Sequence, residues 1–375
     1  MYYEEKKKSK EKIIMYGLMI VIITLLLVLI LKSEVGNNSV SYDYNAQKTN
    51  FDESVDDVKE ENNTNTVKSI EESVDAIVGI SKLKQNGSSI FINNAEEKLG
   101  LGSGVIITEN GYILTNQHVA GNKYSSCYVM LDDGNTYDGN VVWSDSNIDL
   151  AIVKINKSNL KYIELGNSDT LRLAEDVYAI GNPLGMEFQK TVTKGIVSSL
   201  NRTIKIEDNS QNVYMEDLIQ IDATINEGNS GGALINSIGE LIGINSVKIS
   251  NAEGIGFAVP INVVKPIINK FINNGKFEEA CLGIFGYDKE AIRYLNDGLD
   301  IENGIYVAQI TSDGPLLNSN VKEGDIITQI DDVKISKMND LKQYIYGKNP
   351  GDKVVLYVER GKNKFTVDVT LSSKI

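Results

Sequence analysis

The sequence of 375 residues has one histidine, two cysteines and no excess of positive charge, and each shortage excludes a class of function. Only His118 can act as a histidine base. Cys127 and Cys281 lie far apart, and no Cys-x-x-Cys or Cys/His spacing points to zinc, so we interpret both as small apolar side chains. A net charge of −14 argues against nucleic-acid binding, which needs a basic face.

One long run of the sequence carries no charge. It is IIMYGLMIVIITLLLVLIL, residues 13–31, and a helix of that length spans roughly 28 Å, close to the ~30 Å hydrocarbon core of a bilayer. Five lysines precede it, which predicts that residues 1–12 form a cytoplasmic tail and that the body of the protein is exported. The alternative is a cleaved signal peptide, but the run is long and no A-x-A site follows it. We therefore expect an uncleaved transmembrane helix.

Composition changes twice after this run. Residues 32–66 are polar and acidic with no clear periodicity, which predicts a disordered linker. From Val67 a short helix is expected to run into a strand, and many short apolar runs follow, with hairpin signals at Glu109-Asn110-Gly111 and Asp133-Gly134-Asn135. An amphipathic helix in 261–277 closes this region. The pattern indicates a mostly β domain over 67–278, folded as a barrel or a sandwich.

The last part of the chain, 279–375, forms a second strand-rich module. It contains one clear helix near 338–346 and no internal repeat. Its length is that of a small independent domain.

The first candidate catalytic residue is Ser230, a possible nucleophile that lies in the string GNSGG. A serine hydroxyl is a poor nucleophile unless a base lies in hydrogen-bond reach and a third group orients that base. Backbone N–H groups must also face the developing oxyanion, and the glycines around Ser230 permit such a loop. Because glycine–serine turns are common, this string alone does not identify an enzyme.

His118 and Asp149 supply the two missing groups. His118 follows a strand with alternating apolar residues, and Asp149 immediately precedes the apolar run LAIVKI. A carboxylate that is buried needs a partner, although Asp149 could instead cap a turn and Asp145 is a nearby alternative. The order His, Asp, Ser is that of the two-barrel serine proteases.

Seven separated strings now resemble the HtrA/Deg family of trypsin-like serine proteases, in the order found in that family. They are GSGVIITENGYILTNQHV, DLAIVKI, AIGNPLG, TVTKGIVSSLNR, QIDATINEGNSGGALIN, GELIGINS and GIGFAVPI. The resemblance implies a mostly β fold: a trypsin-like double six-stranded β-barrel, followed by a PDZ domain over 279–375 and preceded by a transmembrane helix.

The resemblance also implies roles for individual residues. His118 is the general base and then acid, Asp149 orients it, and Ser230 is the nucleophile. The oxyanion donors are the backbone N–H groups of Gly228 and Ser230, and Asn229 contributes to the shape of the loop.

Substrate recognition is implied at two further places. Ile225 and Ile255 match positions that line the primary specificity pocket and favour a small aliphatic side chain before the cleaved bond. In the PDZ domain the matching carboxylate-binding loop is Cys281, Leu282, Gly283 and Ile284, and the adjacent strand edge accepts a peptide as an added strand. The alternative is that the C-terminal module serves only for packing and binds no ligand.

Three features depart from the family pattern. Glu227 and Ala233 stand where many relatives have proline, and loss of proline frees the backbone before the oxyanion hole. The loop from 185 to 190 is short, which argues against a large caged oligomer and leaves the homotrimer that the resemblance implies.

These observations predict a membrane-anchored, extracytoplasmic serine endoprotease, of bacterial origin, that cleaves misfolded or unfolded polypeptides and binds C-terminal peptides at its PDZ domain. No metal or cofactor is expected. Activity should rise as the pH passes roughly 6.5 to 7, because the mechanism needs neutral His118. The alternatives are a chaperone, or a PDZ-led adaptor, built on a protease-like scaffold.

Overall fold

A computed structural model describes residues 54–82, 101–182, 190–208, 211–226, 228–248, 254–294 and 298–374, together with Thr24. The chain divides into two compact units, Met1–Asp56 and Asp57–Ile375, and the second contains all the elements discussed below except the first residues of α2. The expected cytoplasmic tail and, apart from Thr24, the expected transmembrane helix lie outside the described residues. Among the residues that are described, no helix is both long and apolar enough to cross a bilayer.

The first described helix, α2 (Ser54–Val74), begins earlier than the sequence suggested. Residues 54–66 were expected to belong to the disordered linker, and they are helical instead. A polar composition argues against a buried core but not against a helix, because helix hydrogen bonds are made within the segment itself. At the other end of α2, Ser73 Oγ donates to the carbonyl oxygen of Gly239 at 3.0 Å, which attaches the last turn to the folded body.

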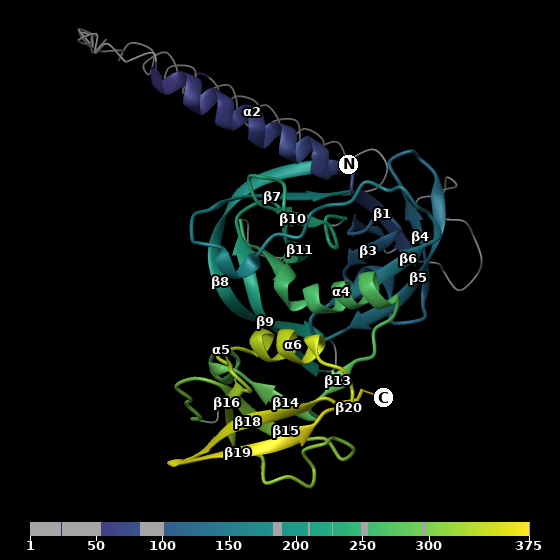
Figure 1. The fold of residues 1–375 in the computed structure, drawn as a ribbon. Coiled ribbons are helices and arrows are strands. Elements are labelled where there is room, and N and C mark those ends of the chain that lie inside the picture. Colours follow the sequence, from purple (N-terminus) through teal and green to yellow (C-terminus); the bar gives the residue numbers. More distant parts are fainter. Residues whose placement is uncertain are drawn as a thin grey trace, which may run out of the picture. The chain divides into compact units, whose positions relative to one another are not determined.

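Two closed six-stranded barrels follow, as the family resemblance implied (Figure 1). The first has the order β1-β2-β3-β6-β5-β4 and consists of β1 (Ile77–Lys82), β2 (Leu101–Ile106), β3 (Tyr112–Thr115), β4 (Ser126–Met130), β5 (Thr136–Asp145) and β6 (Leu150–Ile155). The second has the order β10-β11-β12-β9-β8-β7 and consists of β7 (Asp176–Gly181), β8 (Thr191–Asp208), β9 (Gln211–Ile221), β10 (Ala233–Ile235), β11 (Leu241–Lys248) and β12 (Gly256–Pro260).

Both expected hairpins are present. Gly111, between β2 and β3, has φ 91°, and Gly134, between β4 and β5, has φ 77°. A side chain at Gly111 would also meet the carbonyl oxygen of Ile155 at 2.8 Å, so this turn requires glycine. Closing each sheet removes its open edges, which explains how short strands with few residues of contact form a stable domain.

The short helices lie in the chain between β3 and β4 of the first barrel, between the two barrels, and after the second barrel. They are α3 (Gln117–Ala120), η1 (Ser168–Thr170), η3 (Ile261–Val263) and α4 (Lys265–Asn274). The amphipathic helix expected at the end of the domain is α4. It buries Ile267, Ile268 and Phe271 in the core shared by the two barrels and ends at Gly275, which has a left-handed conformation.

The C-terminal module has its own hydrophobic core, which includes Ile305, Ile327 and Leu356. Its main sheet has the order β14-β15-β16-β18-β19, with β17 paired to β16, and a separate pair joins β13 to β20. The elements are β13 (Ala280–Cys281), β14 (Ile284–Tyr287), α5 (Lys289–Ile292), β15 (Ile305–Ile310), β16 (Ile326–Ile330), β17 (Val333–Lys334), α6 (Met338–Gly347), β18 (Lys353–Arg360), β19 (Asn363–Thr370) and β20 (Ser372–Ser373). The expected helix near 338–346 is α6.

Hydrogen bonds join this module to the barrels within the second compact unit. Asn339 N, at the start of α6, donates to Asp217 Oδ2 on β9 at 2.8 Å. Tyr346 Oη, near the end of α6, donates to Asp145 Oδ2 at 2.6 Å.

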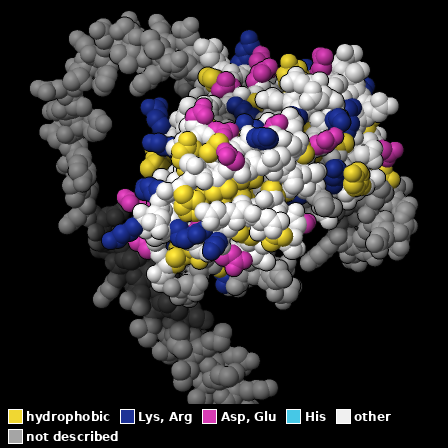
Figure 2. Space-filling view, turned by 60° about the horizontal axis from the view of Figure 1, so that its bottom comes forward, with side chains coloured by type: hydrophobic (Ala, Val, Ile, Leu, Met, Phe, Trp, Pro, Cys, Tyr) yellow, Lys and Arg dark blue, Asp and Glu magenta, His cyan; other side chains and the backbone are white. Residues whose placement is uncertain are grey.

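Figure 2, which turns the lower part of Figure 1 toward the reader, shows hydrophobic side chains gathered across one face, with acidic and basic side chains around them.

Candidate active site

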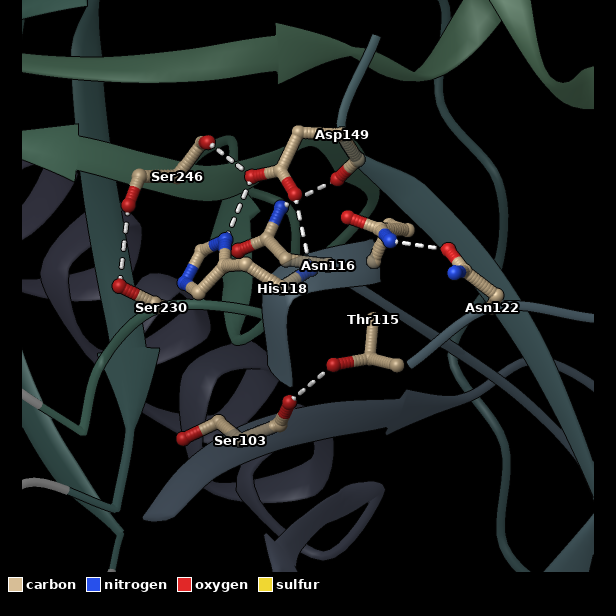
Figure 3. A network of polar contacts seen from close by, with 9 residues as sticks. Ser103, Thr115, Asn116, His118, Asn122, Asp149, Ser230 and Ser246 are labelled. Atoms are coloured by element: carbon tan, nitrogen blue, oxygen red, sulfur yellow. Dashed lines mark hydrogen bonds and ion pairs between the residues drawn. The ribbon is translucent and has the colours of Figure 1, made fainter. Parts of the chain in front are cut away.

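His118 and Asp149 form the centre of a polar network between the barrels (Figure 3). Strand β3 ends at Thr115, and the one-turn helix α3 then places His118 against Asp149. His118 Nδ1 lies 2.7 Å from Asp149 Oδ2, and the backbone N–H of His118 donates to Asp149 Oδ1 at 3.0 Å. The carboxylate therefore fixes both the ring and the backbone of the histidine, as a base-orienting group must.

The position of Asp149 depends on an unusual backbone conformation. Its φ is 52°, a left-handed conformation in the turn between β5 and β6. The carbonyl oxygen of Asp149 accepts hydrogen bonds from Asn116 Nδ2 at 2.9 Å and from Gln117 N at 3.2 Å. These bonds hold the strained residue beside α3.

Asp145, the alternative carboxylate, makes hydrogen bonds to other residues than His118. It is 5% exposed and bonds to Tyr346 Oη and to the backbone N–H of Asn147. Burial opposes ionisation of Asp145, but the charges of Lys374 and Lys342, together with the hydrogen bonds from Tyr346 and Asn147, outweigh it and hold the pKa of Asp145 below its ordinary value. The structure thus brings Asp149, and not Asp145, to His118.

Ser246 on β11 is a member of the network that sequence reasoning missed. Its Oγ donates to Asp149 Oδ2 at 2.9 Å, and its side chain is buried. Its backbone carbonyl oxygen accepts a hydrogen bond from Ser230 Oγ, also at 2.9 Å. The signal was present in the string GINSVKI, where two polar residues interrupt an apolar strand, and a buried hydroxyl needs a partner.

Ser230 lies on the same side of the histidine ring as the nitrogen that is not bonded to Asp149 (Figure 3). The loop that carries Ser230 is fixed to the first barrel by two bonds of Ser103. Ser103 Oγ donates to the carbonyl oxygen of Gly228 at 2.6 Å, and Ser103 N donates to the carbonyl oxygen of Ser230 at 2.8 Å. The nucleophile candidate is therefore placed by β2, in the opposite barrel.

The glycine at 231 is required by space as well as by backbone angle. Gly231 has φ 82°, and a Cβ there would lie 2.2 Å from the carbonyl oxygen of Ser103 and 2.3 Å from Thr115 Oγ1. Since no side chain fits, the string GNSGG reflects a close approach between the two barrels.

Two backbone N–H groups of this loop are available. Within the described part of the chain, no hydrogen-bond acceptor is found for the N–H of Gly228 or of Ser230. The N–H of Asn229 donates to the carbonyl oxygen of Asn226 at 3.0 Å and so serves the shape of the loop. Glu227 and, except for Lys190, the short loop at 185–190 lie outside the described residues.

The two isoleucines expected in the specificity pocket flank the beginning of β12. Ile225 is 3% exposed and belongs to the core of the second barrel. Its Cγ1 lies 2.7 Å from where a Cβ on Gly256 would stand, and Gly256 follows the half-buried Ile255. Their role in choosing substrates stays a prediction.

The expected carboxylate-binding loop lines a cavity of about 660 Å³ in the C-terminal module. Cys281, Leu282, Gly283 and Ile284 line it together with Leu341, Lys342 and Ile345 of α6. Gly283 has φ 70°, and its carbonyl oxygen accepts from Thr311 N at 2.8 Å. Neither cysteine forms a disulfide. Cys127 is buried as expected, but Cys281 is half-buried, with its Sγ 3.1 Å from Ser372 Oγ.

Comparison with known proteins gives the same two-part organisation. Residues 102–244 match the model of the trypsin-like peptidase domain family, and residues 285–371 match that of the PDZ domain family. Serine protease Do-like HtrB of Bacillus subtilis (strain 168) is 37% identical over 334 residues, which cover 84% of this chain and 72% of that protein. Periplasmic pH-dependent serine endoprotease DegQ of Escherichia coli (strain K12) is 38% identical over 280 residues, covering 73% and 60%.

A solved structure is similar over most of this chain. It is described as HtrA-type protease AlgW with tripeptide, and it superposes with a TM-score of 0.60 at 32% identity. The match covers 83% of this chain and 97% of that one.

Proposed function

Because the chain belongs to the HtrA (Do-like) family of trypsin-type serine proteases, we propose that His118, Asp149 and Ser230 form the catalytic triad of a serine endoprotease. The observation that carries this proposal is the continuous set of contacts from His118 through Asp149 and Ser246 to Ser230. A turn-forming serine would need no such connection to the only histidine in the sequence.

Each residue of the network has a defined task. Rotation about χ1 turns Ser230 Oγ from the carbonyl of Ser246 toward Nε2 of His118, which takes the hydroxyl proton as the oxygen attacks the carbonyl carbon of the substrate. Asp149 holds the ring in the correct tautomer and stabilises the imidazolium. His118 then gives its proton to the leaving amine, the C–N bond breaks, and a water molecule releases the acyl group by the same steps in reverse.

The N–H groups of Gly228 and Ser230 stabilise the negative oxygen of the tetrahedral intermediate. They have no acceptor among the described residues, so substrate need not displace an internal bond. Ile225 and Ile255 select a small aliphatic side chain before the cleaved bond, since no charged group stands at either position.

The substrates are unfolded or misfolded polypeptides. The PDZ domain binds C-terminal peptides, whose terminal carboxylate is received by Cys281, Leu282, Gly283 and Ile284. β14 is an edge strand of its sheet, so a peptide can add beside it.

The protein works outside the cytoplasm, held to the membrane by residues 13–31, and assembles as a homotrimer. Support for the location comes from the uncharged run behind five lysines and from relatives that are named periplasmic.

The test is cleavage of unfolded casein by the full-length protein in detergent, beside its Ser230→Ala variant and a Ser198→Ala control. Ser198 is an exposed serine on the long strand β8. The wild-type protein and the control should release fragments, and Ser230→Ala should release none. Equal cleavage by Ser230→Ala would show that Ser230 is not the nucleophile.

A further inference from the structure

The wall of the peptide cavity in the PDZ domain is completed by residues of the second barrel. Tyr214 and Glu216 on β9 line the same cavity of about 660 Å³ as the carboxylate-binding loop and α6. A peptide added along β14 would therefore present side chains to the protease domain as well as to its own module.

Among the described residues that line this cavity, Glu216 is the half-buried carboxylate that lacks a partner, whereas Asp313, also without one, is exposed to solvent. Glu279 and Asp145, which also line the cavity, lie 2.6 Å and 3.6 Å from Lys374 Nζ. Glu216 has no hydrogen bond or ion pair with any described residue, although it is half-buried. Buried charge without a partner is unfavourable, so Glu216 needs a cation or a proton.

The surroundings of Glu216 are predominantly negative. Asp217 follows it on β9, and Asp288, which caps α5, acts on it from the C-terminal module. The one basic residue acting on it is Lys342 of α6, which lines the same cavity without reaching ion-pair distance. Burial, with the charges of Asp288 and Asp217 and against that of Lys342, raises the pKa of Glu216 to about 8. A second cation placed beside Glu216 would therefore stabilise its ionised form.

We infer that Glu216 makes the cavity selective for C-terminal peptides that carry a lysine or arginine side chain upstream of the terminal residue. The inference rests on the proposed peptide binding by the PDZ domain and adds to it a specificity residue from the protease domain. The cation of the peptide pairs with Glu216 inside a partly desolvated cavity, where such a pair is stronger than at the surface.

Proton linkage gives this selectivity a distinct signature. Without a peptide, Glu216 is mostly protonated at neutral pH, and a bound lysine favours its ionised form, so binding releases a proton. The preference for lysine over a neutral side chain should therefore grow as the pH rises from 6 to 9, while lysine itself stays charged.

The experiment uses the full-length protein with Ser230→Ala, so that peptides are bound and not cut. The fluorescein-labelled peptides end in an apolar residue. Lysine and norleucine are compared at each of the four preceding positions, one position at a time. The Kd of each peptide is measured by fluorescence anisotropy at pH 6, 7.5 and 9. At one position lysine should bind about tenfold tighter than norleucine at pH 9, and less than about threefold tighter at pH 6.

Two further variants locate the effect. Glu216→Gln should remove the lysine preference, measured as the ratio of the two Kd values, and its pH dependence. Asp313→Asn is the matched control, because Asp313 lines the same cavity but is exposed to solvent, and it should change the preference by less than about twofold.

The outcomes distinguish a failure of the lysine selectivity from a failure of the proposed peptide binding by the PDZ domain. If no peptide binds, the peptide-binding function of the module is wrong and the selectivity with it. If norleucine peptides bind but lysine brings no gain at any position, or the gain survives Glu216→Gln, the selectivity alone is overturned. Should Glu216→Gln fail to fold, the pH profile of the protein with Glu216 intact decides by itself.

Discussion

Ser230 Oγ donates its hydrogen bond to the backbone carbonyl of Ser246, 2.9 Å away, while the side chain of the same Ser246 holds Asp149. One residue of β11 thus touches both the proposed nucleophile and the proposed orienting carboxylate. The hydroxyl of Ser230 donates to a carbonyl acceptor in this structure, and the proposed mechanism requires it to turn from there to His118. We expect the following consequences.

Replacing Ser246 by alanine should weaken catalysis without preventing it. The change removes a donor to the buried carboxylate of Asp149, and a hydrogen bond to a charged group contributes about 1.5–3 kcal/mol. We expect kcat for a chromogenic peptide to fall at least about tenfold with KM nearly unchanged, since the backbone carbonyl that contacts Ser230 remains. Ser198→Ala should leave both constants as they are. A rise in KM with constant kcat would place Ser246 in substrate binding instead.

Asp149→Asn should lower kcat by about 10³–10⁴ while the protein stays folded. An amide that faces Nδ1 of His118 offers a donor and stabilises the tautomer that leaves no acceptor for the serine proton. The matched control is Asp138→Asn, at an exposed position on β5. Both proteins should show the same circular dichroism spectrum, and wild-type activity in Asp149→Asn would remove this residue from the triad.

Gly231→Ala and Gly254→Ala should differ sharply, although both glycines have positive φ values, 82° and 69°. A Cβ at 231 would clash with backbone and side-chain atoms of the first barrel, whereas no atom of a described residue lies within 4 Å of a Cβ at 254. We expect Gly231→Ala to destabilise the fold by about 2–4 kcal/mol and to abolish casein cleavage. Gly254→Ala should cost about 1 kcal/mol and keep activity. Thermal unfolding and the casein assay, run on both variants, check this.

The stability of the docked α6 should depend on pH through Asp217. Burial, together with the charge of Asp288, raises the pKa of Asp217 to about 7, although Asn339 N and Lys337 oppose the rise. The folded protein therefore binds a proton that the unfolded chain has released above about pH 4, so stability falls as the pH rises from 4 to 7. Between pH 5 and pH 8 the loss should be on the order of 1–3 kcal/mol.

Asp217→Asn tests this linkage, because the amide oxygen of asparagine can still accept from Asn339 N. The variant should unfold at a higher temperature than wild type at pH 8 and at a similar one at pH 5. Asp138→Asn should follow the wild-type curve. A wild-type midpoint that does not change between pH 5 and pH 8 would contradict the raised pKa.

Much of this protein could be predicted from sequence because its information is local. Alternating apolar residues and the glycines Gly111 and Gly134 predicted the hairpins, which are confirmed. This local pattern left a barrel or a sandwich open, and the two barrels were implied by the family resemblance. Polarity, by contrast, misled the interpretation of 54–66, since a helix needs no apolar face to satisfy its backbone. Local patterns are reliable where one segment satisfies its own hydrogen bonds or shows one repeating face.

The sequence by itself determined that the chain has one histidine base at most, a glycine-flanked serine and an aspartate ahead of a buried strand. The tertiary structure places Asp149 and not Asp145 against His118, as the family resemblance implied. It alone decided that Ser246 joins the network and that Glu216 of a barrel lines the cavity of another domain. Ser246 and Asp149 are 97 residues apart. Contacts over such separations depend on how two sheets close and pack, and no repeating local pattern records which polar side chains that packing brings within 3 Å.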